Sequence, residues 1–354
     1  MPTIDIINRP ANFLEGKTLA GGWIVKEKIT KPFDPAVSSF AKSYIVERKE
    51  EDGKTKVALL KALDFSVALL DEEPTKALIM LAKSYDFEKE LLELCKIQRL
   101  TKIVTIIDQG VIPPISGSII QVPYFILEYA EKDVKSQIDF DSRLNTAWLL
   151  RILHNVTVGL WQLHSNGVAH KNVRPDSIME FRKDLQKLTD IGNSDKKGFE
   201  TPGKISPLAI DPAYYTPEFL YNHSETDWVH TSQATDAYLL GNLIFFLFTQ
   251  TSFNTWLLHY LDDTHKPNEW SGTYEEVLTY LEEAYEKAIL HFTAWVEEPK
   301  LKAELAGALR LLCHPNPRKR GHPLNIASIG SSLSVERFIS LFRRLQVEAE
   351  LEIK

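Results

Sequence analysis

Two short segments indicate the fold of this chain. They are His-Lys-Asn-Val-Arg-Pro-Asp-Ser at positions 170–177 and Asp-Ile-Gly at positions 190–192. Taken alone, Asp-x-Gly is a common turn, because aspartate bonds to its own backbone and glycine adopts left-handed conformations freely. In the first segment, Asn172 carries an amide, which has no useful basicity. The two segments together, in this order and with strands before them, indicate a particular fold.

The two segments resemble the catalytic loop and the metal-binding turn of eukaryotic-type protein kinases, whose patterns read H-R-D-x-x-x-x-N and D-F-G. The resemblance implies that Asn172 replaces the aspartate that accepts the proton of the substrate hydroxyl. Ser177 replaces the asparagine that helps to hold a second magnesium ion, whereas Asp190 keeps the position of a magnesium ligand. Arg174 is a further catalytic candidate in the loop. The chain is therefore identified as a degenerate, pseudokinase-like member of this superfamily.

The composition excludes several other classes of protein. The 41 Lys and Arg residues against 48 Asp and Glu give a net charge of −7, which argues against nucleic acid or an anionic membrane as the main partner. Cys95 and Cys313 are far apart and lack the spacing of metal ligands, so buried thiols are expected. Residues 1–5 lack the features of a secretory signal, and the apolar run 239–248 is too short to span a bilayer. These features predict a cytoplasmic protein.

The apolar pattern divides the chain into a strand-rich part and a mainly helical part. Alternating apolar residues predict strands at residues 22–29, 43–48, 57–61, 103–107 and 124–127. Helical periodicity predicts one long helix in this part, at residues 75–99, and then helices at residues 144–164 and 234–248.

This order predicts an α+β fold with two lobes, a small antiparallel-sheet lobe with one long helix and a larger helical lobe. The order matches the kinase-like fold. The predicted division is an N-terminal extension at residues 1–19, the lobes at residues 20–130 and 131–322, and a tail at residues 323–354. In the tail, Val335, Phe338, Ile339 and Phe342 have i, i+3, i+4, i+7 spacing. We expect an amphipathic helix there, which packs on the larger lobe or on a partner.

The resemblance also implies a nucleotide site. Lys61 resembles the strand lysine that binds the α- and β-phosphates, and Glu90 resembles its helix partner, with Glu88 as the alternative if the register slips. Taken alone, either residue would be an ordinary surface charge. The spacing between lysine and glutamate is longer than is usual in the family, which places an insertion around residues 69–83.

Other parts of this site depart from the family pattern. Leu59 stands where a small alanine usually lies above the purine, and residues 36–43 lack the glycines that let a backbone approach phosphates. Met179 is expected on the opposite side of the purine. Glu128 and Ala130 belong to the expected hinge, whose backbone meets adenine in relatives.

Four residues are expected to hold the larger lobe together. The resemblance implies that His170 packs internally and that Asp236, on a buried helix, holds the backbone of the catalytic loop. Glu218, in a segment like A-P-E, is expected to pair with Arg320, in a late P-x-x-R-like segment. Such pairing makes physical sense because a buried charge without a partner is costly.

These features predict a pseudokinase that acts as a regulatory or scaffolding module, with weak or no ATP binding and little phosphoryl transfer. The alternative is an unconventional active Ser/Thr kinase that uses Lys61, Glu90 and Asp190 with ATP and Mg²⁺. A third hypothesis is that the chain binds nucleotide as a structural switch and does not turn it over. The sequence itself requires no cofactor. The resemblance implies ATP and Mg²⁺. The expected partner is another protein, with no nucleic acid and no membrane.

Overall fold

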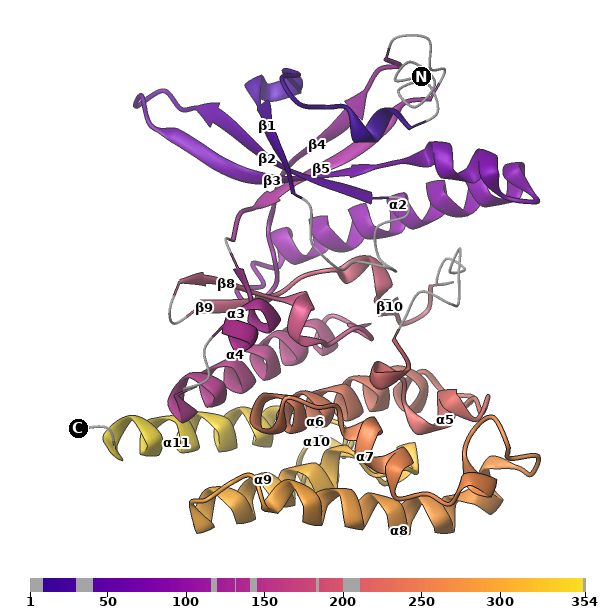
Figure 1. Cartoon of the computed structure of the whole chain (residues 1–354). Helices are drawn as coiled ribbons and strands as arrows, with labels where there is room; N and C mark the ends of the chain where they lie inside the picture. Colours follow the sequence, from indigo (N-terminus) through magenta and orange to yellow (C-terminus); the bar gives the residue numbers. More distant parts are fainter. Residues whose placement is uncertain are drawn as a thin grey trace. The chain divides into compact units, whose positions relative to one another are not determined.

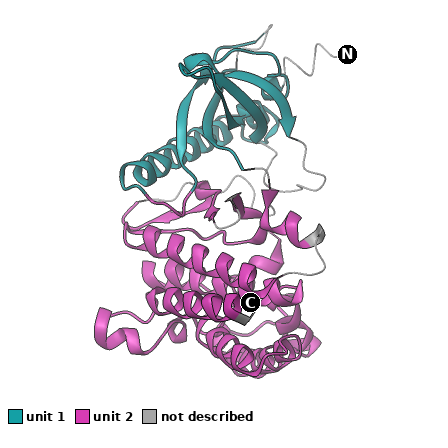
Figure 2. Ribbon diagram, turned by 90° about the vertical axis from the view of Figure 1, so that its left-hand side faces the viewer, with its two compact units in different colours: residues 1–99, 104–131, 201–210 teal, residues 100–103, 132–200, 211–354 magenta. Residues whose placement is uncertain are grey.

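The computed structural model describes residues 9–29, 41–115, 120–130, 132–140, 145–182, 185–199 and 211–352. The chain forms two compact units (Figure 2). Unit 1 comprises residues 1–99, 104–131 and 201–210, and unit 2 comprises residues 100–103, 132–200 and 211–354. Each unit buries its own set of apolar side chains. The four-part division expected from the sequence stays a prediction.

Unit 1 is built on an antiparallel sheet of five strands (Figure 1), in the order β1-β2-β3-β5-β4. The strands are β1 (Ile24–Ile29), β2 (Ala41–Lys49), β3 (Thr55–Leu63), β4 (Ile106–Ile112) and β5 (Val122–Glu128). The burial of β3 alternates: Ala58, Leu60 and Ala62 are fully buried, whereas Leu59 and Lys61 are half-buried. Successive side chains therefore point to opposite faces of the sheet, as the pleat requires.

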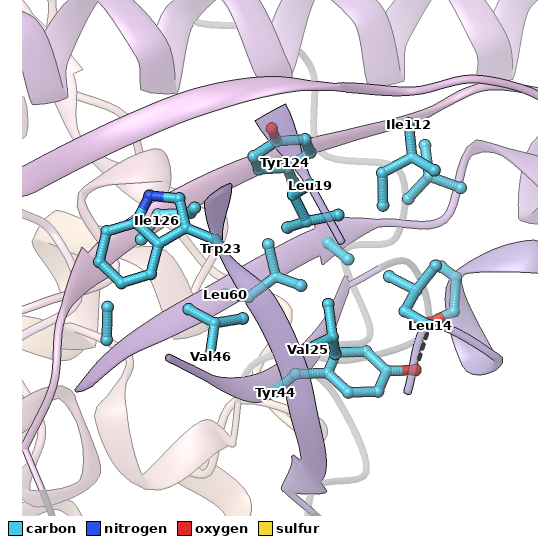
Figure 3. Packing of buried hydrophobic residues seen from close by; sticks show 14 residues of the cluster. Leu14, Leu19, Trp23, Val25, Tyr44, Val46, Leu60, Ile112, Tyr124 and Ile126 are labelled. Carbon is cyan, nitrogen blue, oxygen red and sulfur yellow. Dashed lines mark hydrogen bonds between the residues drawn. The ribbon is translucent and has the colours of Figure 1, made fainter. Parts of the chain in front are cut away.

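One face of this sheet is covered by residues 9–23, which we call the strap. Directly paired residues such as Tyr44 and Leu60 share this face, and their side chains pack with Leu14, Leu19 and Trp23 of the strap (Figure 3). The Tyr44 hydroxyl donates a hydrogen bond of 2.6 Å to the backbone carbonyl of Ala11. The strap is thus an integral layer of unit 1.

The long helix of unit 1 is α2 (Pro74–Ile97), preceded by the 3₁₀ helix η3 (Phe65–Leu70). Proline at the first helical position is favourable because its missing N–H would lack an intrahelical partner there. Beyond that position α2 contains neither proline nor glycine. Tyr85 of α2 stacks on Phe125 of β5, with ring centroids 5.1 Å apart. Because Phe125 pairs with Lys61, α2 covers the sheet face that bears the lysine.

Unit 2 is mainly helical. Its helices are α3 (Val134–Phe140), α4 (Thr146–His164), α5 (Pro217–Leu220), α6 (Ala234–Thr249), α7 (Phe253–His259), α8 (Tyr274–Thr293), α9 (Pro299–Leu312), α10 (Leu324–Ile329) and α11 (Glu336–Glu352). Its short strands are β6 (Lys132–Asp133), β8 (Ile178–Arg182) and β9 (Leu185–Leu188) in one sheet, and β7 (Val168–Ala169) with β10 (Asp195–Lys196) in another. Helix α6 is buried almost all round, as its sequence predicted. The predicted α+β fold class is confirmed.

The helix expected in the tail is present as α11, and it packs on α4 of its own unit (Figure 1). Val335, Phe338 and Phe342 are buried. At the two ends of the contact, Trp161 donates to Glu336 at 2.9 Å and Arg151 pairs with Glu350 at 2.6 Å. The apolar face of α11 is therefore covered by the chain itself.

Both cysteines are free and buried, and burial raises the pKa of the Cys95 thiol to about 12. Neither thiol is therefore a reactive thiolate at neutral pH. Across the described ranges, no helix combines the length and the apolar character needed to cross a bilayer.

Candidate functional site

In unit 1, the candidate phosphate-binding lysine forms an ion pair with α2. The Nζ atom of Lys61 lies 2.6 Å from Oε1 of Glu88, and the two side chains are 18% and 9% exposed. The predicted partner, Glu90, was wrong, because Glu90 is exposed. Two residues along a helix correspond to a rotation of about 200°, so Glu88 and Glu90 point to nearly opposite sides. The register alternative considered for the sequence is the one that the fold adopts.

The strand register defines what surrounds Lys61. Ser43 of β2 and Phe125 of β5 lie directly opposite the lysine, on the same face of the sheet. Leu59 lies between Ile45 and Leu127 on that face and is half-buried. The lysine therefore projects from a mostly apolar surface. Residues 36–40 of the expected phosphate loop lie outside the described residues, whereas residues 41–43 begin β2.

The end of β5 is tied to the chain before β4. The carboxylate of Glu128 accepts the backbone N–H of Thr105 at 2.7 Å, and the backbone N–H of Glu128 donates to the carbonyl of Thr105 at 3.1 Å. Ala130 follows two residues later and is half-buried. The Glu128 side chain thus has a structural partner, and the expected adenine contact of this segment stays a prediction.

In unit 2, His170 connects the loop at residues 170–177 to the chain before Asp190. Its Nε2 donates to the carbonyl of Thr189 at 2.8 Å, and its Nδ1 accepts the backbone N–H of Asn172 at 3.2 Å. Burial lowers the pKa of this imidazole. The ring is therefore neutral, because a protonated Nδ1 has no lone pair for the Asn172 N–H.

Asp236 of α6 binds the backbone of the same loop. Its carboxylate accepts the backbone N–H groups of His170 at 2.8 Å and of Lys171 at 2.7 Å, and the imidazole Nε2 of His164 lies at 2.8 Å. Lys171 has a φ of 57°, a left-handed conformation that non-glycine residues adopt at a cost. These bonds are what hold that conformation. The fully buried carboxylate is in turn satisfied by three donors.

The two degenerate positions of the loop are both buried. Asn172 is 5% exposed, and Ser177 is fully buried. The Ser177 hydroxyl accepts the backbone N–H of Arg174 at 3.0 Å and lies 2.8 Å from the Asn172 carbonyl and 2.9 Å from the Arg174 carbonyl. It therefore caps η4 (Pro175–Ser177) and is committed to the loop's own backbone. It does not fit a metal ligand.

Arg174 has neighbours that the sequence alone did not single out. Its Nη2 donates to Oδ2 of Asp176 at 3.0 Å, and its guanidinium lies 5.5 Å from the centre of the Tyr214 ring. Burial raises the pKa of Tyr214, so this phenol stays protonated. The spacing of Arg174 and Asp176 was visible in the sequence, but the approach of Tyr214 depends on the tertiary fold.

Asp190 has the properties of a ligand for a hard cation. It adopts a left-handed conformation, with φ 61° and ψ 38°, at the start of η5 (Ile191–Asn193). It is half-buried, and within the described ranges nothing donates a hydrogen bond to its carboxylate. A carboxylate of this kind fits Mg²⁺, which prefers oxygen ligands. No group of three or more metal-binding side chains occurs in the part of the chain that the structure describes.

Met179, the purine contact expected in unit 2, lies in β8 and pairs with Asp133 of β6. Its side chain is half-buried. The structure assigns it no polar function, and its expected role stays a prediction.

The predicted ion pair between Glu218 and Arg320 is present. Arg320 Nη1 and Nη2 donate to the two carboxylate oxygens of Glu218 at 2.8 and 2.6 Å. The remaining donors of the fully buried guanidinium reach the backbone carbonyls of His314, Pro315 and Ala234. The pair links α5 to the segment that follows α9.

Comparisons with known proteins agree with this arrangement. The model of the protein kinase domain matches residues 55–325. Serine/threonine-protein kinase ssp1 of Schizosaccharomyces pombe is 25% identical over 146 residues, which are 40% of this chain and 22% of that protein. A probable serine/threonine-protein kinase of Clostridium acetobutylicum is 24% identical over 193 residues, 52% of this chain and 27% of that protein. The chain thus matches about a quarter of the length of these relatives.

Proposed function

Because the chain belongs to the protein kinase family, we propose that it is a pseudokinase, a regulatory or scaffolding module that binds another protein. In this proposal the kinase-like fold is retained, nucleotide binding is weak or absent, and little phosphate is transferred. The proposal concerns this chain and not the whole of its longer relatives.

The observation that carries the proposal is the state of the loop at residues 170–177. Asn172 has no carboxylate, and loss of a general base costs about 10²–10⁴-fold in rate. The Ser177 hydroxyl is committed to the backbone of Asn172 and Arg174, so it does not replace the asparagine that helps to hold the second metal ion in the family. The loop keeps its shape through Asp236 and lacks two of the groups that would do chemistry.

Leu59 supports weak nucleotide binding. A leucine in a pocket shaped for a flat ring beside alanine overfills it, and overpacking costs about 1–3 kcal/mol. That penalty corresponds to about a ten- to hundredfold loss of affinity.

The second candidate function, an unconventional active Ser/Thr kinase, is favoured by two other observations. Lys61 is already paired with Glu88, the arrangement that positions a lysine for phosphate, and the Asp190 carboxylate is without a partner among the described residues. When bound, ATP with Mg²⁺ would supply the transferable phosphoryl group and neutralise its charge. Lys61 would contact phosphate, Asp190 would hold the metal ion, and Glu88, not Glu90, would orient the lysine.

Titration of the purified chain with ATP separates these functions. We expect no rise in the melting temperature at millimolar ATP, with or without Mg²⁺, and no transfer of radiolabelled phosphate to a generic protein substrate. A rise without transfer would indicate a nucleotide-dependent switch. Mg²⁺-dependent transfer that Lys61→Met and Asp190→Asn both abolish would overturn the pseudokinase proposal and establish the enzyme.

A further inference from the structure

The five-stranded sheet of unit 1 has two edges, and the chain covers one of them itself. Strand β1 forms the first edge, and the strap pairs with it: Gly16 donates its backbone N–H to the carbonyl of Val25, and Val25 donates to the carbonyl of Lys17, each at 2.9 Å. Strand β4 forms the second edge, and among the described residues β5 is the only strand that pairs with it. The outer side of β4 is therefore a sheet edge that no described strand covers.

The strand register shows which backbone groups of β4 point outward. Along an antiparallel pair, residues alternate between exchanging both backbone hydrogen bonds with the partner strand and directing both groups away from it. Val111 lies opposite Pro123, which has no N–H and cannot exchange both bonds. The bond from the Glu128 N–H to the Thr105 carbonyl gives the same alternation, because the residues of β5 that face β4 are then the even-numbered ones. The N–H and C=O groups of Val111 and of Gln109, two residues earlier, therefore point away from β5.

The side chain of Asp108 caps this outer side. Its Oδ1 accepts the outward N–H of Gln109 at 2.8 Å, the group that an added strand would need for one of its own carbonyls. Its Oδ2 accepts the indole N–H of Trp23 at 3.2 Å. At Gly21 of the strap, where φ is 73°, an added Cβ would lie 2.7 Å from the same Oδ2 atom. The strap therefore both binds this carboxylate and leaves room for it.

The run of β4 with outward groups is short and complementary to itself. It ends before Pro113 and Pro114, which have no N–H groups to offer. A twofold axis at Gly110 would place Gln109 of one copy opposite Val111 of another. Because both residues direct their N–H and C=O groups outward, the two such pairs would exchange four backbone hydrogen bonds. Gly110 would face its own counterpart across the axis, with no side chains to collide.

The charges also permit a second copy at this edge. In the twofold arrangement the two Asp108 residues are separated by four residues along the paired strands, or about 14 Å. That separation exceeds the Debye length of about 8–10 Å at ordinary ionic strength, so the two carboxylates would repel each other weakly. Val111, which is 48% exposed, would gain a cover. A second copy therefore matches this edge in length, in hydrogen-bonding groups and in charge.

We propose that Asp108 is an autoinhibitory cap, which prevents the sheet edge at β4 from pairing with a second copy of the chain. While the strap is docked, Trp23 holds the Asp108 carboxylate on the N–H of Gln109, and the chain stays monomeric. When the carboxylate is released, residues 109–111 pair with the same residues of a second copy, which joins two five-stranded sheets into one. This proposal does not rest on the pseudokinase function.

The test measures the oligomeric state of the full chain by sedimentation velocity over a range of protein concentrations. Asp108→Ala removes the cap, and Trp23→Phe keeps an aromatic ring but removes the donor that holds the cap. Each is also made together with Val111→Pro, because proline blocks an added strand at this position. The proline removes no bond to β5, since the Val111 N–H points outward. Asp86→Ala, at an exposed position of α2, is the matched control for the loss of one negative charge.

We expect the parent and Asp86→Ala to be monomeric. The dissociation constant of the Asp108→Ala dimer should be at least about tenfold lower than that of the parent, because a hydrogen bond to a charged group no longer competes with strand pairing. Trp23→Phe should shift it in the same direction by a smaller factor. Adding Val111→Pro should return both variants to the behaviour of the parent. The melting temperature of each variant shows that it is folded, and Trp23→Phe decides the outcome if Asp108→Ala does not fold.

Three results would overturn the proposal. The first is a folded Asp108→Ala or Trp23→Phe variant that is as monomeric as the parent, and the second is a dimer that persists with Val111→Pro. The third is a monomeric Asp108→Ala variant that binds a fluorescein-labelled peptide of alternating threonine and valine and loses it with Val111→Pro. That result would assign the edge to a strand of another protein. None of these measurements depends on ATP, so they stand apart from the test of the pseudokinase function.

Discussion

At the scale of single residues, the loop at residues 170–177 has a well-bonded backbone and carries Asn172 and Ser177 at two positions where the family pattern has Asp and Asn. Asp236 and His170 hold its backbone with bonds of 2.7–3.2 Å, although no acidic side chain occupies position 172. Asp236, His170 and Ser177 have their hydrogen-bond partners, which is the condition under which buried polar groups stabilise a core, whereas Arg174 Nε and Asp176 Oδ1 are buried without a partner among the described residues. The backbone of the loop is therefore held without an acidic side chain at position 172.

The Glu218–Arg320 pair gives the first prediction. Arg320→Ala should lower the free energy of unfolding by about 3–5 kcal/mol, because Glu218 would be left charged and buried without its partner. Urea unfolding followed by circular dichroism measures the change. Arg310→Ala is the matched control, because Arg310 and Glu286 are each about half exposed and exposed pairs contribute at most about 1 kcal/mol. Equal midpoints for Arg320→Ala and the parent would show that the pair adds nothing to stability.

His170 gives the second prediction, on pH. Its folded pKa is lowered by burial from 6.5, so below pH 6.5 the unfolded chain binds a proton that the folded chain does not. The contribution of His170 to the free energy of unfolding should therefore be fully present above pH 6.5. It should fall by up to about 1.4 kcal/mol per pH unit as the pH drops toward the folded pKa.

The variant His170→Gln isolates this contribution, because glutamine does not titrate and still offers a donor and an acceptor. Urea unfolding at several pH values below 6.5 measures how the free energy of unfolding changes with pH. In the variant the slope of this change should be smaller, by an amount that corresponds to at most one proton taken up on unfolding. Identical dependence in both proteins would mean that His170 titrates alike in the folded and unfolded chains.

Residue-level prediction from sequence succeeded where a motif has a fixed spacing and failed where it does not. Asp236, Glu218 and Arg320 follow from local patterns, and the structure contains the bonds expected of them. The choice of Glu88 over Glu90 depends on the rotation of α2, and the signal for it was present, because Glu88 precedes the buried Leu91 and Leu92 by three and four residues and so lies on the inward face. The buried cap formed by Ser177, in contrast, depends on the path of the loop and was hidden from the sequence.

At the scale of elements, the apolar patterns predicted four strands of unit 1 and the helices α2, α4 and α6 to within a few residues, shifted one strand, and gave no bounds for most other elements of unit 2. The fourth strand was expected at residues 103–107 and is found at Ile106–Ile112. Asp108, Gln109 and Gly110 do not look like strand residues, but they are paired with β5. Ile103 instead forms an isolated bridge to Leu188. Pairing with a neighbouring strand overrode local preference there.

Helix α11 gives the third prediction. Phe338→Ala and Phe342→Ala should each lower the free energy of unfolding by about 3–5 kcal/mol, because both rings are buried under α4. Val347→Ala, on the exposed side of α11, is the control and should change the unfolding free energy little. Calorimetry or urea unfolding of the full chain measures both. An unchanged midpoint for the phenylalanine variants would indicate that α11 is held by other contacts.

The strap was one part of the fold that the sequence interpretation missed. Residues 1–19 were treated as an extension, whereas residues 9–23 form a layer of unit 1. A signal was present: runs such as residues 57–60 and 124–127 are apolar on both faces, and strands of that kind need a cover on each side. Which segment supplies the second cover is a tertiary question that the pattern alone does not answer.

At the scale of the whole molecule, the proposed loss of activity has several independent causes, and the fourth prediction tests this by repair. Asn172→Asp alone should not restore phosphoryl transfer, because Leu59 and Ser177 still weaken nucleotide and metal binding. Leu59→Ala should raise ATP affinity by about ten- to a hundredfold. Measurable transfer from radiolabelled ATP is expected only when Leu59→Ala, Asn172→Asp and Ser177→Asn are combined.

Two controls make the repair experiment decisive. The melting temperature of each variant shows whether the larger asparagine is accommodated at the fully buried position 177. Adding Lys61→Met to the combined variant should remove any restored transfer. Full activity from Asn172→Asp alone would show that position 172 is the single defect and that Leu59 and Ser177 do not limit nucleotide or metal binding.

The strap also imposes an order on events during synthesis. The indole N–H of Trp23 donates to Asp108 Oδ2, a partner 85 residues further along the chain. At roughly 5–20 residues per second, the ribosome makes Asp108 about 4–17 s after Trp23. During that interval β1, β2 and β3 are available to pair, but Trp23, Leu14 and Leu19 still lack part of the surface that they will cover. The nascent chain therefore carries an uncovered apolar segment until β4 and β5 emerge, and this is the stage at which a chaperone would engage it.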